Sequence, residues 1–163
     1  MFLFKTIFMA AIVVASAATA DTLEEMGGTW RGSGWAREIQ QGPQETMRCR
    51  ITNSYDAAVL TLTLTGQCVV PGRRLTISGT LTGTEGVERI TGRWSNPDGI
   101  GSTRIMGIQR DGIVAFNFIA TDPATGRSLA QNVEWRVSDE TLRLRSTDRS
   151  DPSTMMSDIT FGR

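Results

Sequence analysis

Apolar and polar residues alternate along most of this chain. Residues 59–65 (VLTLTLT) and 75–81 (LTISGTL) alternate strictly, and from Leu129 to Val137 the odd-numbered positions carry most of the large apolar side chains. Successive side chains of a strand point to opposite faces, so this period of two predicts strands with one buried and one solvated face.

Turn-forming segments interrupt the alternation at regular intervals. Clusters of Gly, Pro, Asn, Asp and Ser, such as Pro71-Gly72 and Asp111-Gly112, recur from residue 41 to residue 153. About ten strands joined by short turns predict an antiparallel meander. Closure removes the exposed edges of such a sheet, so we expect an all-β fold, an antiparallel up-and-down β-barrel of about 8–10 strands. A two-sheet sandwich is the alternative.

One helical turn is predicted before the first strand. Asp21-Thr22-Leu23-Glu24 has the form of a capping box, in which Asp21 caps the helix and Glu24 follows three residues later. Gly27-Gly28 then ends the helix.

The N-terminal residues have the features of a cleaved signal peptide. Lys5 precedes a short apolar run at residues 7–15, and Ala18-Thr19-Ala20 forms a cleavage site before Asp21. We therefore expect a signal peptide at 1–20, a single barrel domain at 21–163 and a periplasmic or secreted protein. The run is too short to span a membrane, and no cysteine follows it to carry a lipoprotein anchor.

The composition argues against several kinds of binding and catalysis. The chain has 17 basic and 17 acidic residues, scattered along its length, which argues against a nucleic-acid partner. It has no histidine, which excludes Ser-His-Asp and Cys-His catalysis and removes the commonest zinc ligand. We expect no enzymatic activity, no metal and no cofactor.

The two cysteines, Cys49 and Cys68, are the only ones in the chain. Each has the same parity as the apolar residues of its predicted strand, Met47 and Ile51 in one case and Leu64 in the other. In an exported protein this arrangement predicts one disulfide between adjacent strands.

The stretch GTWRGSGW at residues 28–35 sets the first strand apart. Trp30, Gly32, Gly34 and Ala36 share one face, so a large ring is followed by positions with almost no side chain. Glycine weakens a strand but permits the sharp bend that closes a small barrel. We expect Trp30 to plug one end of the barrel, and the space beside the glycines to be filled from opposite strands or left as a cavity.

A helical turn followed by Gly-x-Trp on the first strand resembles the calycin superfamily of lipocalin and fatty-acid-binding barrels, and the longer stretch is most similar to nitrobindin-like barrels. The resemblance implies a ligand inside the barrel and a late arginine over Trp30, for which Arg143, Arg145 and Arg163 are candidates. Nitrobindin-like proteins hold haem through a histidine, which this chain lacks, so haem binding is not implied.

Inward polar residues and large aromatics complete the candidate site. Glu38, Glu88, Asn117 and Gln131 are assigned inward parity, although the two glutamates near strand ends can instead lie in solvent. The expected ligand-binding residues are Trp30, Gly32, Gly34, Glu38, Glu88, Trp94, Asn117, Gln131 and Trp135.

Two functions are compatible with these features. The first is binding of a small apolar ligand in the barrel interior. The alternative is an envelope protein-interaction module, such as a periplasmic protease inhibitor, because small exported metalloprotease inhibitors resemble this chain in their signal peptide, early Gly-x-Trp and single disulfide. A lined interior favours the ligand, whereas a filled barrel with exposed apolar residues favours a protein partner.

Overall fold

The computed structural model describes residues 21–96, 101–121 and 125–163. The predicted signal peptide lies outside the described residues. The described chain forms one short helix, α1 (Thr22–Glu25), and ten strands. The strands are β1 (Gly28–Ala36), β2 (Glu45–Asp56), β3 (Thr61–Val70), β4 (Arg73–Thr84), β5 (Val87–Asn96), β6 (Gly101–Arg110), β7 (Ile113–Thr121), β8 (Ser128–Val137), β9 (Thr141–Asp148) and β10 (Met155–Gly162).

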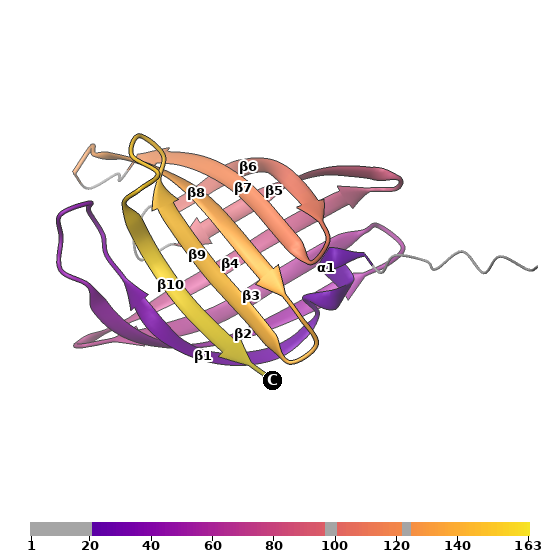
Figure 1. Ribbon diagram of the computed structural model, residues 1–163, viewed down its shortest axis with the longest axis horizontal. Helices are drawn as coiled ribbons and strands as arrows, with labels where there is room; N and C mark the ends of the chain where they lie inside the picture. The colour runs from indigo at the N-terminus through magenta and orange to yellow at the C-terminus, as the bar shows by residue number, and fades with distance from the viewer. Residues whose placement is uncertain (1–20, 97–100, 122–124) are drawn as a thin grey trace, which may run out of the picture.

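The strands form a closed antiparallel barrel (Figure 1). Each strand pairs with its neighbours in the sequence, and β1 also pairs with β10, with Gly32 opposite Phe161 and Gly34 opposite Ile159. The predicted up-and-down barrel is therefore confirmed, and the sandwich alternative is wrong. Closure leaves no unpaired edge among the described strands.

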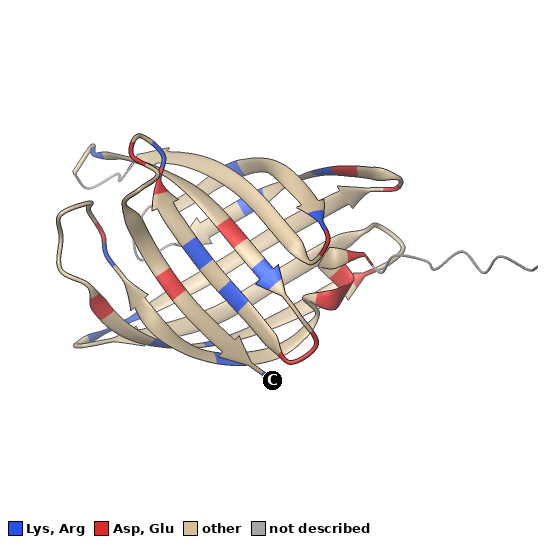
Figure 2. Cartoon of the chain, in the orientation of Figure 1, with Lys and Arg blue, Asp and Glu red and all other residues tan. Residues whose placement is uncertain are grey.

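The two ends of the barrel differ. The start of β1 and α1 lie at one end, which we call the helix end, together with tight connections such as Asp111-Gly112 (Figure 1). The opposite end, which we call the open end, carries the longer connections, including the one between β1 and β2. Charged residues of both signs lie interspersed on the outer faces of β8, β9 and β10, and acidic residues lie on α1 (Figure 2).

The helix end is filled by Trp30 and the residues around it. Trp30 is completely buried, and its indole Nε1 donates a hydrogen bond to the carbonyl oxygen of Met26 over 3.0 Å. The amide of Asn53 donates to the same oxygen over 2.9 Å. Leu23 and Met26 are also completely buried, so α1 is part of the core. Trp30 is thus the predicted plug.

Arg163 is the late arginine that covers Trp30. Its guanidinium carbon lies 4.4 Å from the centre of the Trp30 ring, a cation–π geometry. The same group donates hydrogen bonds to the carbonyl oxygens of Asp139 and Glu25, over 3.0 and 3.3 Å. The other two candidates, Arg143 and Arg145, contact Asp158 instead.

The glycines of β1 provide close packing and no cavity. A Cβ placed on Gly32 would lie 2.5 Å from Cδ1 of Phe161, which is itself buried, and one placed on Gly34 would overlap the carbonyl oxygen of Asp158. The second of the two expectations, an empty space beside these glycines, is wrong because β10 passes directly against them. Glycine is needed there to let β1 and β10 approach.

The disulfide is confirmed. Cys49 of β2 and Cys68 of β3 are directly paired residues in the ladder, and their sulfur atoms are bonded. Both cysteines are nearly completely buried, which places the bond on the inner face of the barrel.

Gly34→Ala should destabilise the fold. The added methyl group must displace the β10 backbone, and overpacking of this kind costs about 1–3 kcal/mol. Gly162→Ala is the matched control in β10, because the nearest atom to a Cβ there is 3.9 Å away. Denaturant unfolding should show the loss in G34A alone. Equal stability of the two variants would contradict the close approach of β1 and β10.

Tyr55 should ionise at unusually high pH. Burial, and then a 2.7 Å hydrogen bond to Asp21 together with its charge, raise the pKa of Tyr55 to about 12. Tyr55 is the only tyrosine, so absorbance near 295 nm follows it alone. The raised pKa means that this contact stabilises the fold below the ordinary pKa of 10 and loses its effect as the pH rises towards 12. Asp21→Asn should lower the midpoint, whereas an unchanged midpoint would rule out the contact.

Candidate ligand-binding site

Five apolar side chains at the open end are only half-buried. They are Ala36, Leu75, Ile77, Trp94 and Leu129, from β1, β4, β5 and β8. At the helix end, inward side chains such as Leu62 and Ile90 are completely buried, while Tyr55 and Val137 are half-buried. The open end is therefore distinguished by having more of the half-buried apolar side chains.

Trp94 is the outermost member of a chain of aromatic rings. Its ring centre lies 5.9 Å from that of Phe116 and 6.4 Å from that of Trp135, the latter in an edge-to-face arrangement. Trp135 in turn lies 6.0 Å from Phe161, the side chain that covers Gly32. The rings run from the open end towards the plug, and contacts at these distances hold their neighbours in place.

The indole N–H of Trp135 has no hydrogen-bond partner among the described residues, although the side chain is completely buried. An unsatisfied buried donor costs about 1–3 kcal/mol. The ring that carries this donor lies 6.4 Å from that of Trp94, centre to centre. A ligand or water that supplied an acceptor there would remove this cost.

At the open end, the inner wall formed by β8, β9 and β10 also carries polar side chains. Ser146 of β9 and Ser157 of β10 are buried and share a 2.7 Å hydrogen bond. The half-buried amide of Gln131 on β8 lies beside Asp148 in the ladder and makes no side-chain hydrogen bond within the described residues. Gln131 is therefore the polar group of this wall with free hydrogen-bonding capacity.

The carboxylate of Asp148 is hydrogen-bonded within the turn between β9 and β10. Its Oδ1 accepts hydrogen bonds from the backbone N–H groups of Ser150 and Asp151, over 2.8 and 3.1 Å, and from the Ser150 hydroxyl. These bonds, above all the one from the Ser150 hydroxyl, hold the pKa of Asp148 below its usual value. The carboxylate shapes a loop of the open end.

The structure brings together part of the predicted site. Trp94 and Gln131 lie at the open end, and Trp135 lies beneath them in the core. Trp30 and the two β1 glycines belong to the filled helix end.

Three predicted polar residues lie elsewhere. Glu38 is exposed and pairs with Arg73 over 2.7 Å, and Glu88 is exposed at the helix end, 3.4 Å from Arg110. Both glutamates therefore lie in solvent, which is the alternative stated for residues near strand ends, and not inside the barrel. Asn117 was assigned inward as well, but it is exposed on the outer face because its neighbours Phe116 and Phe118 carry the inward parity of β7.

Sequence reasoning missed Leu75, Ile77, Leu129 and Ala36. Their alternation marks them as inward, as it does for any core residue. Only their position near the strand ends away from α1, combined with the pairing register, distinguishes them. Their position at these strand ends can be read from the sequence only after the order of the strands is known.

No group of three or more His, Cys, Asp or Glu side chains within the described ranges is arranged to hold a metal ion. Over the same ranges, no helix has the length and apolar character needed to cross a membrane. No family model matches the sequence, and no curated protein matches it significantly. The closed ten-stranded barrel is consistent with a calycin-like barrel.

Proposed function

We propose that the chain is an exported calycin-like barrel that binds a small, largely apolar ligand at its open end. The observation that carries this proposal is the ring of half-buried apolar side chains opposite α1. Apolar surface that a fold leaves partly wet gains free energy when a ligand covers it. The signal-like leader in the sequence and the buried disulfide support an oxidising compartment.

The expected affinity is moderate. A ligand that buried about 300 Å² of apolar surface would gain roughly 7 kcal/mol, from which the cost of association is subtracted. The gain alone corresponds to a dissociation constant of roughly 10 μM, so binding weaker than that follows. A polar group on the ligand would find the half-buried Gln131 amide on β8, beside Leu129.

A binding role is also proposed in preference to catalysis. Histidine is absent from the whole sequence, and Asp148, the half-buried acid at the open end, is held in a turn. A protease-inhibitor role of the kind implied by the early Gly-x-Trp would need an N-terminal segment free to enter a protease cleft. Leu23 and Met26 are completely buried in the barrel end, which speaks against that role.

The open end should bind the fluorescent apolar probe N-phenyl-1-naphthylamine. Ile77→Asn places an amide in the apolar ring and should weaken binding at least tenfold. Ile108→Asn is the matched control, because Ile108 is half-exposed on the outer face of β6. Fluorescence titration gives both dissociation constants, and thermal melts confirm folding.

Leu129→Trp provides a second test that adds apolar bulk to the same ring and should exclude the probe. The proposal fails if the probe does not bind the unaltered protein. It also fails if Ile108→Asn abolishes binding while Ile77→Asn and Leu129→Trp leave it intact, because the probe would then bind outside the barrel.

A further inference from the structure

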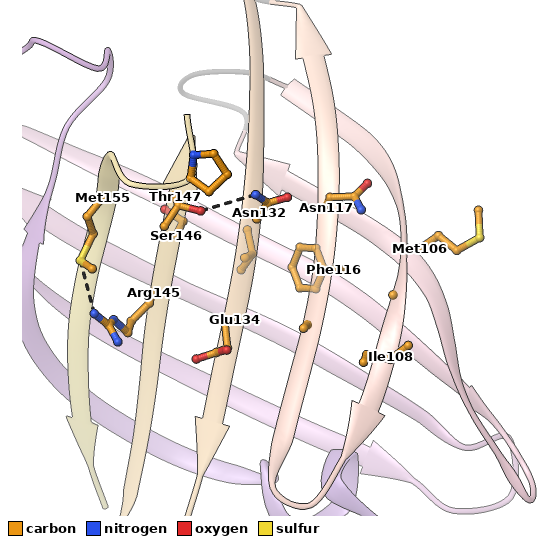
Figure 3. A pocket seen from close by; sticks show the side chains of 14 residues that line it. Met106, Ile108, Phe116, Asn117, Asn132, Glu134, Arg145, Ser146, Thr147 and Met155 are labelled. Atoms are coloured by element: carbon orange, nitrogen blue, oxygen red, sulfur yellow. Dashed lines mark hydrogen bonds between the residues drawn. The ribbon is translucent and has the colours of Figure 1, made fainter. Parts of the chain in front are cut away.

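A groove of about 600 Å³ crosses the outer face of the barrel over β6, β7, β8 and β9 (Figure 3). It lies outside because its lining includes both outward neighbours of the inward residue Phe116, namely Ala115 and Asn117. The volume falls within the range of sites that bind small ligands or short peptides.

Two rows of side chains, each running across the strands, border the groove. Pairing in the ladder aligns Met106, Asn117, Asn132, Thr147 and Met155 in one row. It aligns Ile108, Ala115, Glu134 and Arg145 in the other. A chain lying between the rows would therefore cross the strands at a steep angle, and it would meet apolar, amide and charged groups in turn.

The β6 end of the groove is apolar and exposed. The side chains of Met106 and Ile108 are 61 % and 50 % exposed, and Ile119 on the neighbouring strand is 59 % exposed. Large apolar residues that gather on one outer face mark an interaction site more strongly than single ones.

The amide side chains at the centre of the groove use little of their hydrogen-bonding capacity. Asn132 donates to the Thr147 hydroxyl over 3.5 Å, and Asn117 accepts from Arg149 over 3.4 Å, both at the long limit for hydrogen bonds. Each amide has two donors and an acceptor oxygen, so most of this capacity is free. An alkyl chain would desolvate the amides without replacing their bonds to water, whereas peptide groups would satisfy them.

The β9 end carries Arg145, whose ion pair with Asp158 is long because Arg143 takes both oxygens of that carboxylate. Both oxygens of Asp158 accept from Arg143, over 2.9 and 2.7 Å, while Arg145 lies 3.8 Å from the same carboxylate. Glu134, the cross-strand neighbour of Arg145, pairs with Arg136 over 2.7 Å. The Arg145 guanidinium therefore retains donors for another carboxylate.

We propose that this groove binds the extended C-terminal segment of a protein partner. An apolar side chain of the segment covers Met106 and Ile108, its peptide groups bond to Asn117 and Asn132, and its terminal carboxylate pairs with Arg145. Four strands about 4.8 Å apart span roughly 15 Å, which is four or five residues of extended chain.

The shape of the groove favours a chain end over an internal segment. Beyond Arg145 the groove is bordered by Met155, whose sulfur atom lies 3.9 Å from the guanidinium, and by Pro152. The β6 end has no such border among the lining residues. Recognition of a terminal carboxylate beside an apolar anchor is a recurrent mode of peptide binding. This site is separate from the open end and does not rest on the function proposed for it.

The test is selection from a library of random pentapeptides displayed with free C-termini, using the folded mature protein as bait. The selected peptides should share an apolar residue at or near the fourth or fifth position from the C-terminus. The best peptide is then synthesised as the free acid and as the C-terminal amide, and its binding is measured by fluorescence anisotropy. The free acid should bind at least tenfold more tightly than the amide.

Variants of the outer face locate the site. Arg145→Gln should weaken binding of the free acid at least tenfold, and Ala115→Trp, which fills the groove, should abolish it. Arg50→Gln is the matched control, because Arg50 is an exposed arginine on β2 that does not line the groove. Thermal melts confirm that each variant is folded.

Three outcomes would overturn the proposal. The first is no enrichment over the Ala115→Trp protein. The second is equal binding of acid and amide, or of the protein and its Arg145→Gln variant. The third is displacement of the peptide by N-phenyl-1-naphthylamine in a manner that Ile77→Asn prevents, which would place the peptide at the open end.

Discussion

The close approach of β1 to β10 is the contact on which this barrel depends. A Cβ on Gly34 would overlap the carbonyl oxygen of Asp158, and a Cβ on Gly32 would press on the Phe161 ring. Two glycines thus let the first and last strands pair, and this pairing converts a ten-stranded sheet with two edges into a closed barrel. The interior, its plug and its two unlike ends all follow from that closure.

The two ends differ in how completely their apolar side chains are buried. At the helix end, Trp30 is bonded to Met26, covered by Arg163 and surrounded by completely buried apolar residues. At the open end, the aromatic chain that starts at Phe161 finishes at a half-buried Trp94. The buried indole N–H of Trp135 between them has no partner in the described chain. The half-buried apolar side chains of the open end are the surface that the proposed ligand would cover.

The features that depend on residues close together in the chain were predicted from the sequence. Period-two alternation and turn residues predicted the strands, parity predicted the disulfide, and the capping box predicted α1. The sequence could not show what lies opposite a given residue. Whether the space beside Gly32 is filled or empty was left open, and Phe161, far along the chain, fills it. How far along the barrel axis an inward residue lies depends on the pairing register of all ten strands. Half-buried Ile77 and buried Leu81 therefore show the same local alternation.

The candidate site was predicted only in part, because the sequence does not show which residues lie side by side on different strands. Trp94 and Gln131 were identified from residue type and parity, whereas Leu75, Ile77 and Leu129 resemble any core residue. Asn117 was assigned to the wrong face, although it alternates with Phe116 and Phe118. Nothing local indicated that its row on the outer face continues through Asn132 to Thr147, because such rows exist only after the strands have paired.

The most direct test of the account follows the indole N–H signals of the four tryptophans by NMR during titration with N-phenyl-1-naphthylamine. Trp94 lies at the open end, and Trp30 lies at the opposite end with its N–H bonded to Met26. The account predicts a saturable shift of the Trp94 signal and an unchanged Trp30 signal. A probe that binds while the Trp94 signal stays fixed would contradict a ligand site at the open end of the barrel.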